Sequence, residues 1–248
     1  MRQIGNPFNI IDSVDSTNRL AMEKGTSGNA TSGEVFFALE QTAGRGQRGR
    51  KWATQAGMNI TMSVVLEPES WTTADMFRLN CIAALAASDM FSRYAGDETS
   101  IKWPNDIYWR DRKAGGMLIE NIMRGHQWRC AVVGFGININ QTVFDPKLPN
   151  PVSLRQITGK SFDPINLGRE LCSDFQLRLQ TLAEQGFEAL LESYRQRLYG
   201  RGRLFRLQQL DSVFQTVIKG VDADGNLITE DEQIRKFKFG EISWLGPA

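Results

Sequence analysis

A basic, glycine-rich segment at residues 44–52 most constrains what this chain can fold into. Seven of its nine residues are glycine, arginine or lysine, and it separates two segments, 34–41 and 58–66, whose composition predicts strands. Guanidinium groups form forked hydrogen bonds with phosphates and carboxylates, and glycine lets the backbone approach a ligand closely. Because its four like charges repel one another when no anion is present, we expect a loop that is loose when empty and closes over an anionic ligand.

The net charge of the chain indicates what kind of anion residues 44–52 bind. The chain has 248 residues, 41% of them hydrophobic, and a formal net charge of +1, which argues against a protein whose whole surface binds nucleic acid. A solvated basic turn or an RGG-like nucleic-acid-binding tail is the alternative interpretation of residues 44–52. Such tails usually lie in disordered flanks, whereas this segment lies between two predicted strands, so a small anionic ligand is favoured.

Cysteine and histidine usage excludes several kinds of chemistry. Cys81, Cys130 and Cys172 are far apart in the sequence, which predicts a reducing compartment and no structural zinc site. His126 is the only histidine and falls in a predicted hairpin turn, so a Ser-His-Asp site or a histidine metal site is not expected. No signal peptide opens the chain and no apolar run approaches about 20 residues, which predicts a cytoplasmic protein with no membrane contact.

Periodicity predicts alternating strands and helices through most of the chain. A strand at 8–14 leads to a helix capped by Asp15 or Ser16, and a longer helix begins at Thr72 or Thr73 and continues to about residue 94. Pro104 should end a strand at 100–103. The remaining predicted elements are strands at 107–109, 113–120 and 128–140, a long loop at 141–152, and helices at 164–185 and 187–199.

Two further features concern the site and the domain division. Gly134 and Gly136 place small residues on one face of the 128–140 strand, where we expect room for a ligand. From residue 202 onward, short strands at 203–210, 213–221, 227–229 and 233–239 predict a small β-barrel-like module docked on the larger domain. We therefore expect two domains, at residues 1–200 and 201–248.

Five segments of the chain, taken together, resemble the bacterial biotin–protein ligases. Each segment alone is a weak signal, but all five occur in the family's order and at matching spacing. They are Asp15-Ser16-Thr17-Asn18, Glu40-Gln41-Thr42-Ala43-Gly44-Arg45-Gly46-Gln47-Arg48-Gly49, Lys102-Trp103-Pro104-Asn105-Asp106, Lys113-Ala114-Gly115-Gly116-Met117-Leu118-Ile119-Glu120 and Gly134-Phe135-Gly136-Ile137-Asn138.

The resemblance implies an α+β fold and an ATP-dependent ligase. The catalytic domain would have the mixed sheet and helices of class II aminoacyl-tRNA synthetases and biotin ligases, followed by a small SH3-like β-barrel. The enzyme would form biotinyl-5′-adenylate from biotin and Mg-ATP, then transfer biotin to a lysine of a biotin carboxyl carrier domain of a carboxylase. Such a reaction requires the biotin carboxylate and the ATP phosphates to be held together and their negative charge to be neutralised. Arginines, a lysine and Mg²⁺ can provide this neutralisation.

The resemblance also assigns roles to individual residues. Lys113 and Arg45 would be catalytic, with Lys113 bridging the biotin carboxylate and the α-phosphate, and Asp106 would bind the metal. The loop at 141–152 would order over the adenine. The biotin-binding residues would be Ser16, Thr17, Asn18, Gln41, Arg45, Gly46, Gln47, Lys113, Gly115 and Gly116. The ATP-binding residues would be Arg48, Arg50, Trp52, Asn105, Asp106, Lys113 and Asn138.

The chain departs from the family pattern in two places. An arginine often stands in the family where this chain has Gln47, and the lost charge would weaken retention of the adenylate. The chain begins almost at the catalytic domain, so we expect no N-terminal DNA-binding domain and no repressor activity. A lipoate–protein ligase, which shares the fold and the adenylation chemistry, is the nearest alternative, and a nucleic-acid-binding protein is the alternative from another class.

Overall fold

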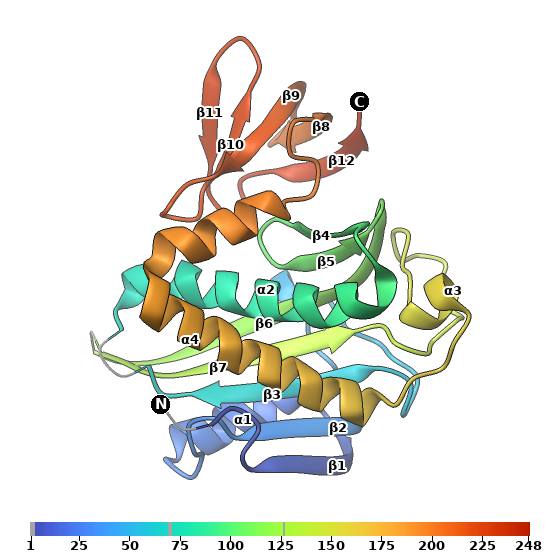
Figure 1. Cartoon of the computed structure of the whole chain (residues 1–248), viewed down its shortest axis with the longest axis vertical. Coiled ribbons are helices and arrows are strands. Elements are labelled where there is room, and N and C mark those ends of the chain that lie inside the picture. Colours follow the sequence, from blue (N-terminus) through green and yellow to red (C-terminus); the bar gives the residue numbers. More distant parts are fainter. Residues whose placement is uncertain (1–2, 69–70, 126) are drawn as a thin grey trace.

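The computed structural model describes residues 3–68, 71–125 and 127–248 and contains two β-sheets with four α-helices in that part of the chain (Figure 1). The larger sheet is mixed, because β1 and β2 run parallel while the other neighbours are antiparallel. Its order is β1-β2-β3-β7-β6-β5-β4. The strands are β1 (Phe8–Val14), β2 (Val35–Gln41), β3 (Ile60–Leu66), β4 (Thr99–Lys102), β5 (Asp106–Trp109), β6 (Arg112–Arg124) and β7 (Gln127–Ile137).

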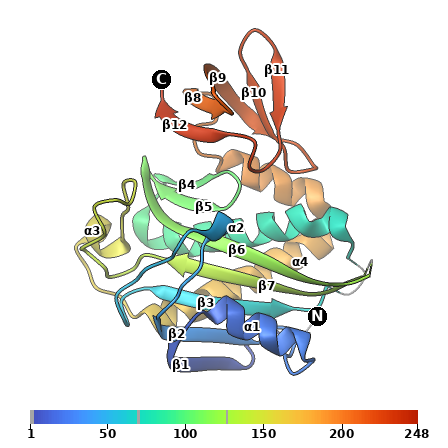
Figure 2. The same ribbon diagram turned by 180° about the vertical axis from the view of Figure 1, so that it is seen from behind.

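Helices cover both faces of this sheet. The helix α1 (Thr17–Thr26) lies on one face, where Ala21 packs with Phe36, Val65 and Val132. The helices α2 (Met76–Ala95) and α4 (Pro164–Gln196) pack together on the opposite face, as Figures 1 and 2 show from the two sides. The central strand β3 is consequently buried along its whole length, as a strand rich in β-branched residues and covered on both faces should be.

The long helices begin where side chains can satisfy their free N–H groups. Thr72 starts a short 3₁₀ turn, η2 (Thr73–Asp75), with a reciprocal capping box to Asp75, and α2 follows directly. The Asp163 carboxylate accepts hydrogen bonds from the first N–H groups of α4, and Pro164 occupies its first position. Both helix starts were predicted from the sequence. The predicted break at Gly186 is a kink within α4 rather than an end.

A five-stranded antiparallel sheet follows and lies against the β4–β5 end of the larger domain (Figure 1). Phe205 is buried in this sheet and packs edge-to-face on Tyr199, which joins the two cores. The sheet confirms the predicted fold class and fits a small SH3-like module. Its strands, in the order β11-β10-β9-β8-β12, are β8 (Leu204–Gln209), β9 (Ser212–Val221), β10 (Leu227–Glu230), β11 (Ile234–Phe237) and β12 (Ser243–Pro247).

Two elements were not predicted from the sequence. The helix α3 (Leu154–Thr158) has five residues, too few for a periodic pattern to be recognised. The strand β12 contains Gly246 and Pro247, which are turn residues, and it forms only by pairing with β8. The predicted turn residue His126 lies outside the described residues, and the domain boundary after residue 200 stays a prediction. None of the helices described is both long and apolar enough to cross a membrane.

Candidate active site

Backbone hydrogen bonds define the conformation of the basic loop between β2 and β3. Arg45 and Lys51 form an isolated β-bridge, and the Gly46 N–H donates to the Arg50 carbonyl at 2.7 Å. Between them lies a single 3₁₀ turn, η1 (Gln47–Gly49), with Arg48 in the left-handed region at φ 56°. Backbone hydrogen bonds therefore close the base of the loop in this structure, and the expected opening of the loop without an anion stays a prediction.

Arg45 is held by a residue that the sequence analysis missed. Its guanidinium lies 3.1 Å from Glu120 Oε1 at the far end of the Lys113–Glu120 motif. The other oxygen of Glu120 accepts a hydrogen bond from Asn18 Nδ2 at 3.0 Å. Glu120 thus joins the basic loop, β6 and the start of α1. A carboxylate directly after the apolar run at 117–119 was the available signal.

The side chains at the start of α1 are buried, and two of them are hydrogen-bonded to residues of neighbouring strands. Gln41 Oε1 accepts hydrogen bonds from the backbone N–H and the hydroxyl of Thr17, at 2.8 and 3.1 Å. Ser63 Oγ lies 2.7 Å from Thr17 Oγ1 and 2.6 Å from Asn18 Oδ1. The structure therefore brings together four residues assigned to biotin, Ser16, Thr17, Asn18 and Gln41, and the polar groups of the last three are engaged within the protein.

The room expected over the glycines of β7 is filled by two side chains. A methyl group placed on Gly134 would lie 2.0 Å from Asn18 Oδ1, and one on Gly136 would lie 2.4 Å from the Trp52 indole. These two glycines therefore accommodate protein side chains in this structure, rather than an open ligand cavity. The Trp52 Nε1–H is buried without a hydrogen-bond partner among the described residues, which is unfavourable.

Lys113 and Asp106 form the central ion pair of the site. Lys113 Nζ lies 2.7 Å from Asp106 Oδ1, and each side chain keeps a little over a quarter of its surface exposed. Gly116 makes room for this pair, because a methyl group there would lie 2.8 Å from Asp106 Oδ1. The close approach predicted at the Gly-Gly motif is therefore made by the ion pair at Gly116 and by the Gly136 carbonyl at Gly115.

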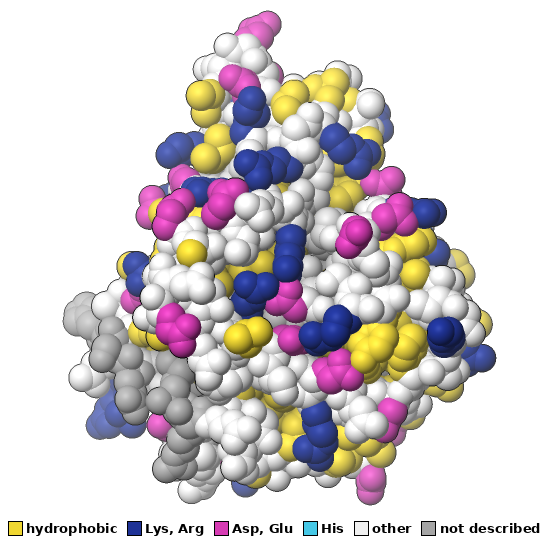
Figure 3. Space-filling view, in the orientation of Figure 1, with side chains coloured by type: hydrophobic (Ala, Val, Ile, Leu, Met, Phe, Trp, Pro, Cys, Tyr) yellow, Lys and Arg dark blue, Asp and Glu magenta, His cyan; other side chains and the backbone are white. Residues whose placement is uncertain are grey.

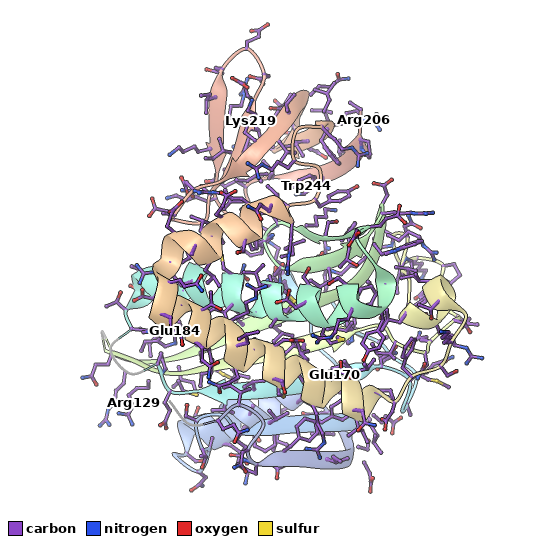
Figure 4. All side chains as sticks on the ribbon, in the orientation of Figure 1. Arg129, Glu170, Glu184, Arg206, Lys219 and Trp244 are labelled. Atoms are coloured by element: carbon purple, nitrogen blue, oxygen red, sulfur yellow. The ribbon has the colours of Figure 1, made fainter. Side chains whose placement is uncertain are left out.

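Lys102 is a further cation of this site that the sequence analysis left without a role. The pKa of Lys102 is lowered to about 8, mainly by burial and to a smaller extent by the nearby charges of Lys113 and Arg50, against the opposing effect of Asp106. Its Nζ lies 3.0 Å from the Tyr108 hydroxyl and 5.5 Å from the ring of Trp244. Figure 4 shows Trp244 on the side of the C-terminal sheet that faces β4.

The two asparagines assigned to ATP are buried and engaged in the protein. Asn105 donates its amide to the Met117 carbonyl, and Met117 returns a backbone hydrogen bond to Asn105 at 3.0 Å. Asn138 donates to the Val152 carbonyl at 3.0 Å. In this structure both asparagines fix the backbone on either side of Lys113, because Val152 N–H also donates to the Lys113 carbonyl.

The acidic groups fit a magnesium ion that arrives with a nucleotide. Within residues 3–68, 71–125 and 127–248, no three His, Cys, Asp or Glu side chains are placed to hold a metal ion together. Mg²⁺ in nucleotide sites usually takes one or two carboxylates and completes its coordination with phosphates and water. Asp106 can supply one such carboxylate. The sequence-based assignment of Asp106 is thus compatible with Mg-ATP and not with a metal held by protein alone.

The cysteines are buried in surroundings that disfavour the thiolate form. All three are buried and unpaired. Burial raises the pKa of Cys130 to about 11 and that of Cys172 to about 12, and it also raises the pKa of Cys81. The chemistry available at the site is therefore the binding and neutralisation of anions by Arg45, Arg48, Arg50, Lys102 and Lys113, rather than nucleophilic attack by a thiolate.

Comparisons with known proteins agree with this arrangement. The model of the Biotin/lipoate A/B protein ligase family matches residues 10–138. The bifunctional ligase/repressor BirA of Bacillus subtilis is 32% identical over 238 residues, which cover 93% of this chain and 72% of that protein. The biotin–[acetyl-CoA-carboxylase] ligase of Paracoccus denitrificans is 31% identical over 223 residues, covering 87% of this chain and 90% of that protein.

A solved structure extends the similarity through the C-terminal sheet. The biotin protein ligase from Aquifex aeolicus in complex with biotin and ATP superimposes with a TM-score of 0.82 at 25% identity, covering 96% of this chain and 98% of that one. Its match spans both sheets described above. The chain belongs to the biotin/lipoate A/B protein ligase family.

Proposed function

We propose that this protein is an ATP-dependent biotin–protein ligase. It forms biotinyl-5′-adenylate from biotin and ATP and then transfers biotin to a lysine of a biotin carboxyl carrier domain. The observation that carries the proposal is the cluster of Lys113, Asp106, Lys102 and the basic loop at one edge of the sheet. The Aquifex relative binds biotin and ATP on the same fold, and the Paracoccus relative carries the corresponding enzyme name.

In the first step, an oxygen of the biotin carboxylate attacks the α-phosphorus of ATP. The bond from that phosphorus to the bridging oxygen breaks, and pyrophosphate leaves with the electron pair. Lys113 bridges the carboxylate and the α-phosphate, so it reduces their repulsion and stabilises the charge of the transition state. Arg45, where the two sides of the basic loop meet, contributes positive charge to binding the same anions.

In this structure the Lys113 ammonium is paired with Asp106 at 2.7 Å. Asp106 would hold a magnesium ion together with the nucleotide phosphates, and that ion would supply further neutralisation of phosphate charge. Lys113 would exchange Asp106 for the two reacting anions when biotin and ATP bind.

The loop supplies the remaining contacts to the nucleotide. Arg48 and Arg50 bind the phosphates, Trp52 packs against the nucleotide, and residues 141–152 close over the adenine. Asn105 and Asn138 act on the nucleotide side by holding the backbone around Lys113. Closure of these segments also excludes water, which would otherwise hydrolyse the adenylate.

The biotin side of the site is built from the start of α1, the end of β2 and the glycines of β6. Small polar side chains can hydrogen-bond the ureido ring of biotin while the adjacent apolar surface covers its carbon chain. The biotin-binding residues are Ser16, Thr17, Asn18, Gln41, Arg45, Gly46, Gln47, Lys113, Gly115 and Gly116. The Trp52 indole covers Gly136 beside these residues.

In the second step, the neutral ε-amine of the acceptor lysine attacks the carbonyl carbon of the adenylate. An amide bond forms, AMP leaves with the anhydride oxygen, and the amine loses a proton. The chain needs no nucleophile of its own in either step. Its contribution is to hold the adenylate in a fixed orientation and to keep Lys113 near the departing phosphate.

Isotope exchange between ATP and pyrophosphate in the presence of Mg²⁺ tests the first step. We expect exchange that depends on biotin and is not supported by lipoate at the same concentration. Exchange driven by lipoate alone would support adenylation but contradict biotin as the substrate. The family description includes lipoate ligases as well as biotin ligases. Absence of exchange with both acids would overturn the ligase assignment.

The nucleic-acid alternative is not favoured. On the face that Figure 3 shows, positive and negative side chains are interspersed, and they form no continuous basic surface. A salt series of RNA filter binding would detect phosphate contacts as a steep loss of affinity with salt. We expect only weak binding. The predicted absence of DNA binding and the cytoplasmic location stay predictions.

A further inference from the structure

A turn of the C-terminal module contacts the tip of the basic loop. This turn, residues 238–241, is closed by hydrogen bonds between Lys238 and Glu241. Arg48 Nη2 donates a hydrogen bond of 2.6 Å to the Gly240 carbonyl, and the guanidinium carbon lies 5.5 Å from the centre of the Phe239 ring. The approach is so close that a methyl group on Gly240 would lie 2.0 Å from Arg48 Nη2.

The same turn contacts a second element of the nucleotide site. The Phe239 ring, 51% exposed, packs edge-to-face on Trp103 with ring centres 6.2 Å apart. Trp103 also donates its indole N–H to the Gly225 carbonyl at 2.9 Å. Trp103 lies in the turn that presents Asp106. One small module therefore touches both the phosphate-binding loop and the turn that carries the carboxylate proposed for the metal.

The contact between Arg48 and the turn matters because ordering the basic loop is unfavourable in free energy. Four cations in residues 45–51 repel one another, and each residue that becomes ordered loses conformational entropy. Arg48 lies at the tip, in a left-handed conformation at φ 56°, within the turn that the Arg50 N–H closes on the Gln47 carbonyl at 3.2 Å. A partner at the tip reduces the ordering that ATP must cause when it binds, and so strengthens ATP binding.

We infer that the turn at residues 238–241 is a positioning element for Arg48, through which the C-terminal module completes the ATP site. Phe239 and the Gly240 carbonyl hold the guanidinium on the nucleotide side before ATP arrives. The inference rests on the proposed function for its consequence in catalysis, but the contact itself can be tested without any ligand. Phe239 is a positioning residue because it acts through Arg48.

Limited trypsin digestion of the ligand-free protein tests the contact directly. Cleavage after Arg48, Arg50 and Lys51, followed by mass spectrometry, reports how often the loop opens. We expect Phe239→Ala to accelerate cleavage at these three bonds about three- to tenfold, because an arginine–aromatic contact and its adjacent hydrogen bond are lost. Phe239→Leu keeps apolar volume without the ring and should accelerate cleavage in the same direction.

Ile234→Ala is the matched control, since Ile234 lies in the same module and is 68% exposed. It should leave loop cleavage unchanged. Equal cleavage rates in wild type and both Phe239 variants would overturn the inference. This result would stand even for a protein that shows no ATP–pyrophosphate exchange, so failure of the contact and failure of the ligase assignment are separable.

A double-mutant cycle tests the consequence for ATP. We expect Arg48→Ala and Phe239→Ala each to raise KM for ATP, with KM for biotin changed less than twofold. If Phe239 acts through Arg48, the double variant should have the KM of Arg48→Ala alone. Multiplicative effects of the two substitutions would overturn the inference. So would a lower KM for ATP in Phe239→Ala, which would mean that the turn holds Arg48 away from the nucleotide.

Discussion

At the scale of single residues, the account depends on Lys113 and its exchange of partners. In this structure Lys113 is paired with Asp106 at 2.7 Å, and during adenylation it would bridge two substrate anions. An ammonium that stabilises charge developing in the transition state contributes more to the rate than to ground-state binding. The effect of removing Lys113 should therefore fall mainly on kcat.

Lys113→Ala should reduce biotin-dependent ATP–pyrophosphate exchange about 10²- to 10³-fold, as loss of one transition-state donor does in other enzymes. The control is Lys160→Ala, which removes an exposed lysine before α4. It should leave the exchange rate unchanged. An exchange rate for Lys113→Ala within about threefold of wild type would contradict the role given to this residue.

Lys102 should make ATP use depend on pH. Burial lowers its pKa from 10.5 to about 8, so the positive charge is present below that pH and is lost as the pH rises through it. Since kcat/KM reports the free enzyme, kcat/KM for ATP should fall above about pH 8. Lys102→Arg keeps its charge throughout this range and should remove the fall. Identical pH profiles of the two proteins would contradict the proximity of Lys102 to the phosphates.

The sequence identified most of the residues that meet at the site but not their partners. Lys113 and Asp106 were recognised because they stand in motifs with family spacing. The pairing of Arg45 with Glu120 joins residues 75 positions apart, and no local pattern encodes it. The filling of the space over Gly136 by Trp52 was missed for the same reason. A glycine in a strand indicates that another group lies close to the backbone there, but it does not show whether that group belongs to a ligand or to the protein.

At the scale of elements, the sheet was predictable wherever burial imposed a strong pattern. The strand β3 is apolar and β-branched along its length, and α2 repeats apolar residues at helical spacing with a capping threonine before it. By contrast, β12 carries Gly246 and Pro247 and exists only because β8 is available to pair with it. Tertiary context, rather than local preference, decides such segments.

The glycine at position 134 offers a test of how β7 positions α1. A methyl group there would overlap Asn18 Oδ1, so Gly134→Ala should displace the buried start of α1. We expect a loss of roughly 1–3 kcal/mol in unfolding free energy, as for other overpacked sites, and a weaker affinity for biotin. Gly220→Ala is the control in β9, since a methyl group there meets no atom within 4 Å. Equal unfolding free energies of the two variants, measured in urea, would contradict this packing.

At the scale of the whole molecule, the larger sheet and the C-terminal sheet meet around Arg48 and Lys102. Arg48 and Gly240 are separated by 192 positions in sequence and joined by a hydrogen bond. Lys102 lies between Tyr108 of the larger sheet and Trp244 of the smaller one. The module could be predicted from the change to short strands after residue 202, but its contacts could not, because they depend on how two separately patterned sheets dock.

The central claim is that this chain joins biotin to a carrier lysine through an adenylate, with Lys113 serving the first step. The most direct measurement is intact-protein mass spectrometry of an unmodified biotin carboxyl carrier domain incubated with the enzyme, biotin and Mg-ATP. We expect one biotinyl group per carrier domain, formed with one AMP released, and almost none with Lys113→Ala over the same time. A carrier domain left unmodified by the wild-type enzyme, or modified equally by both proteins, would contradict the account.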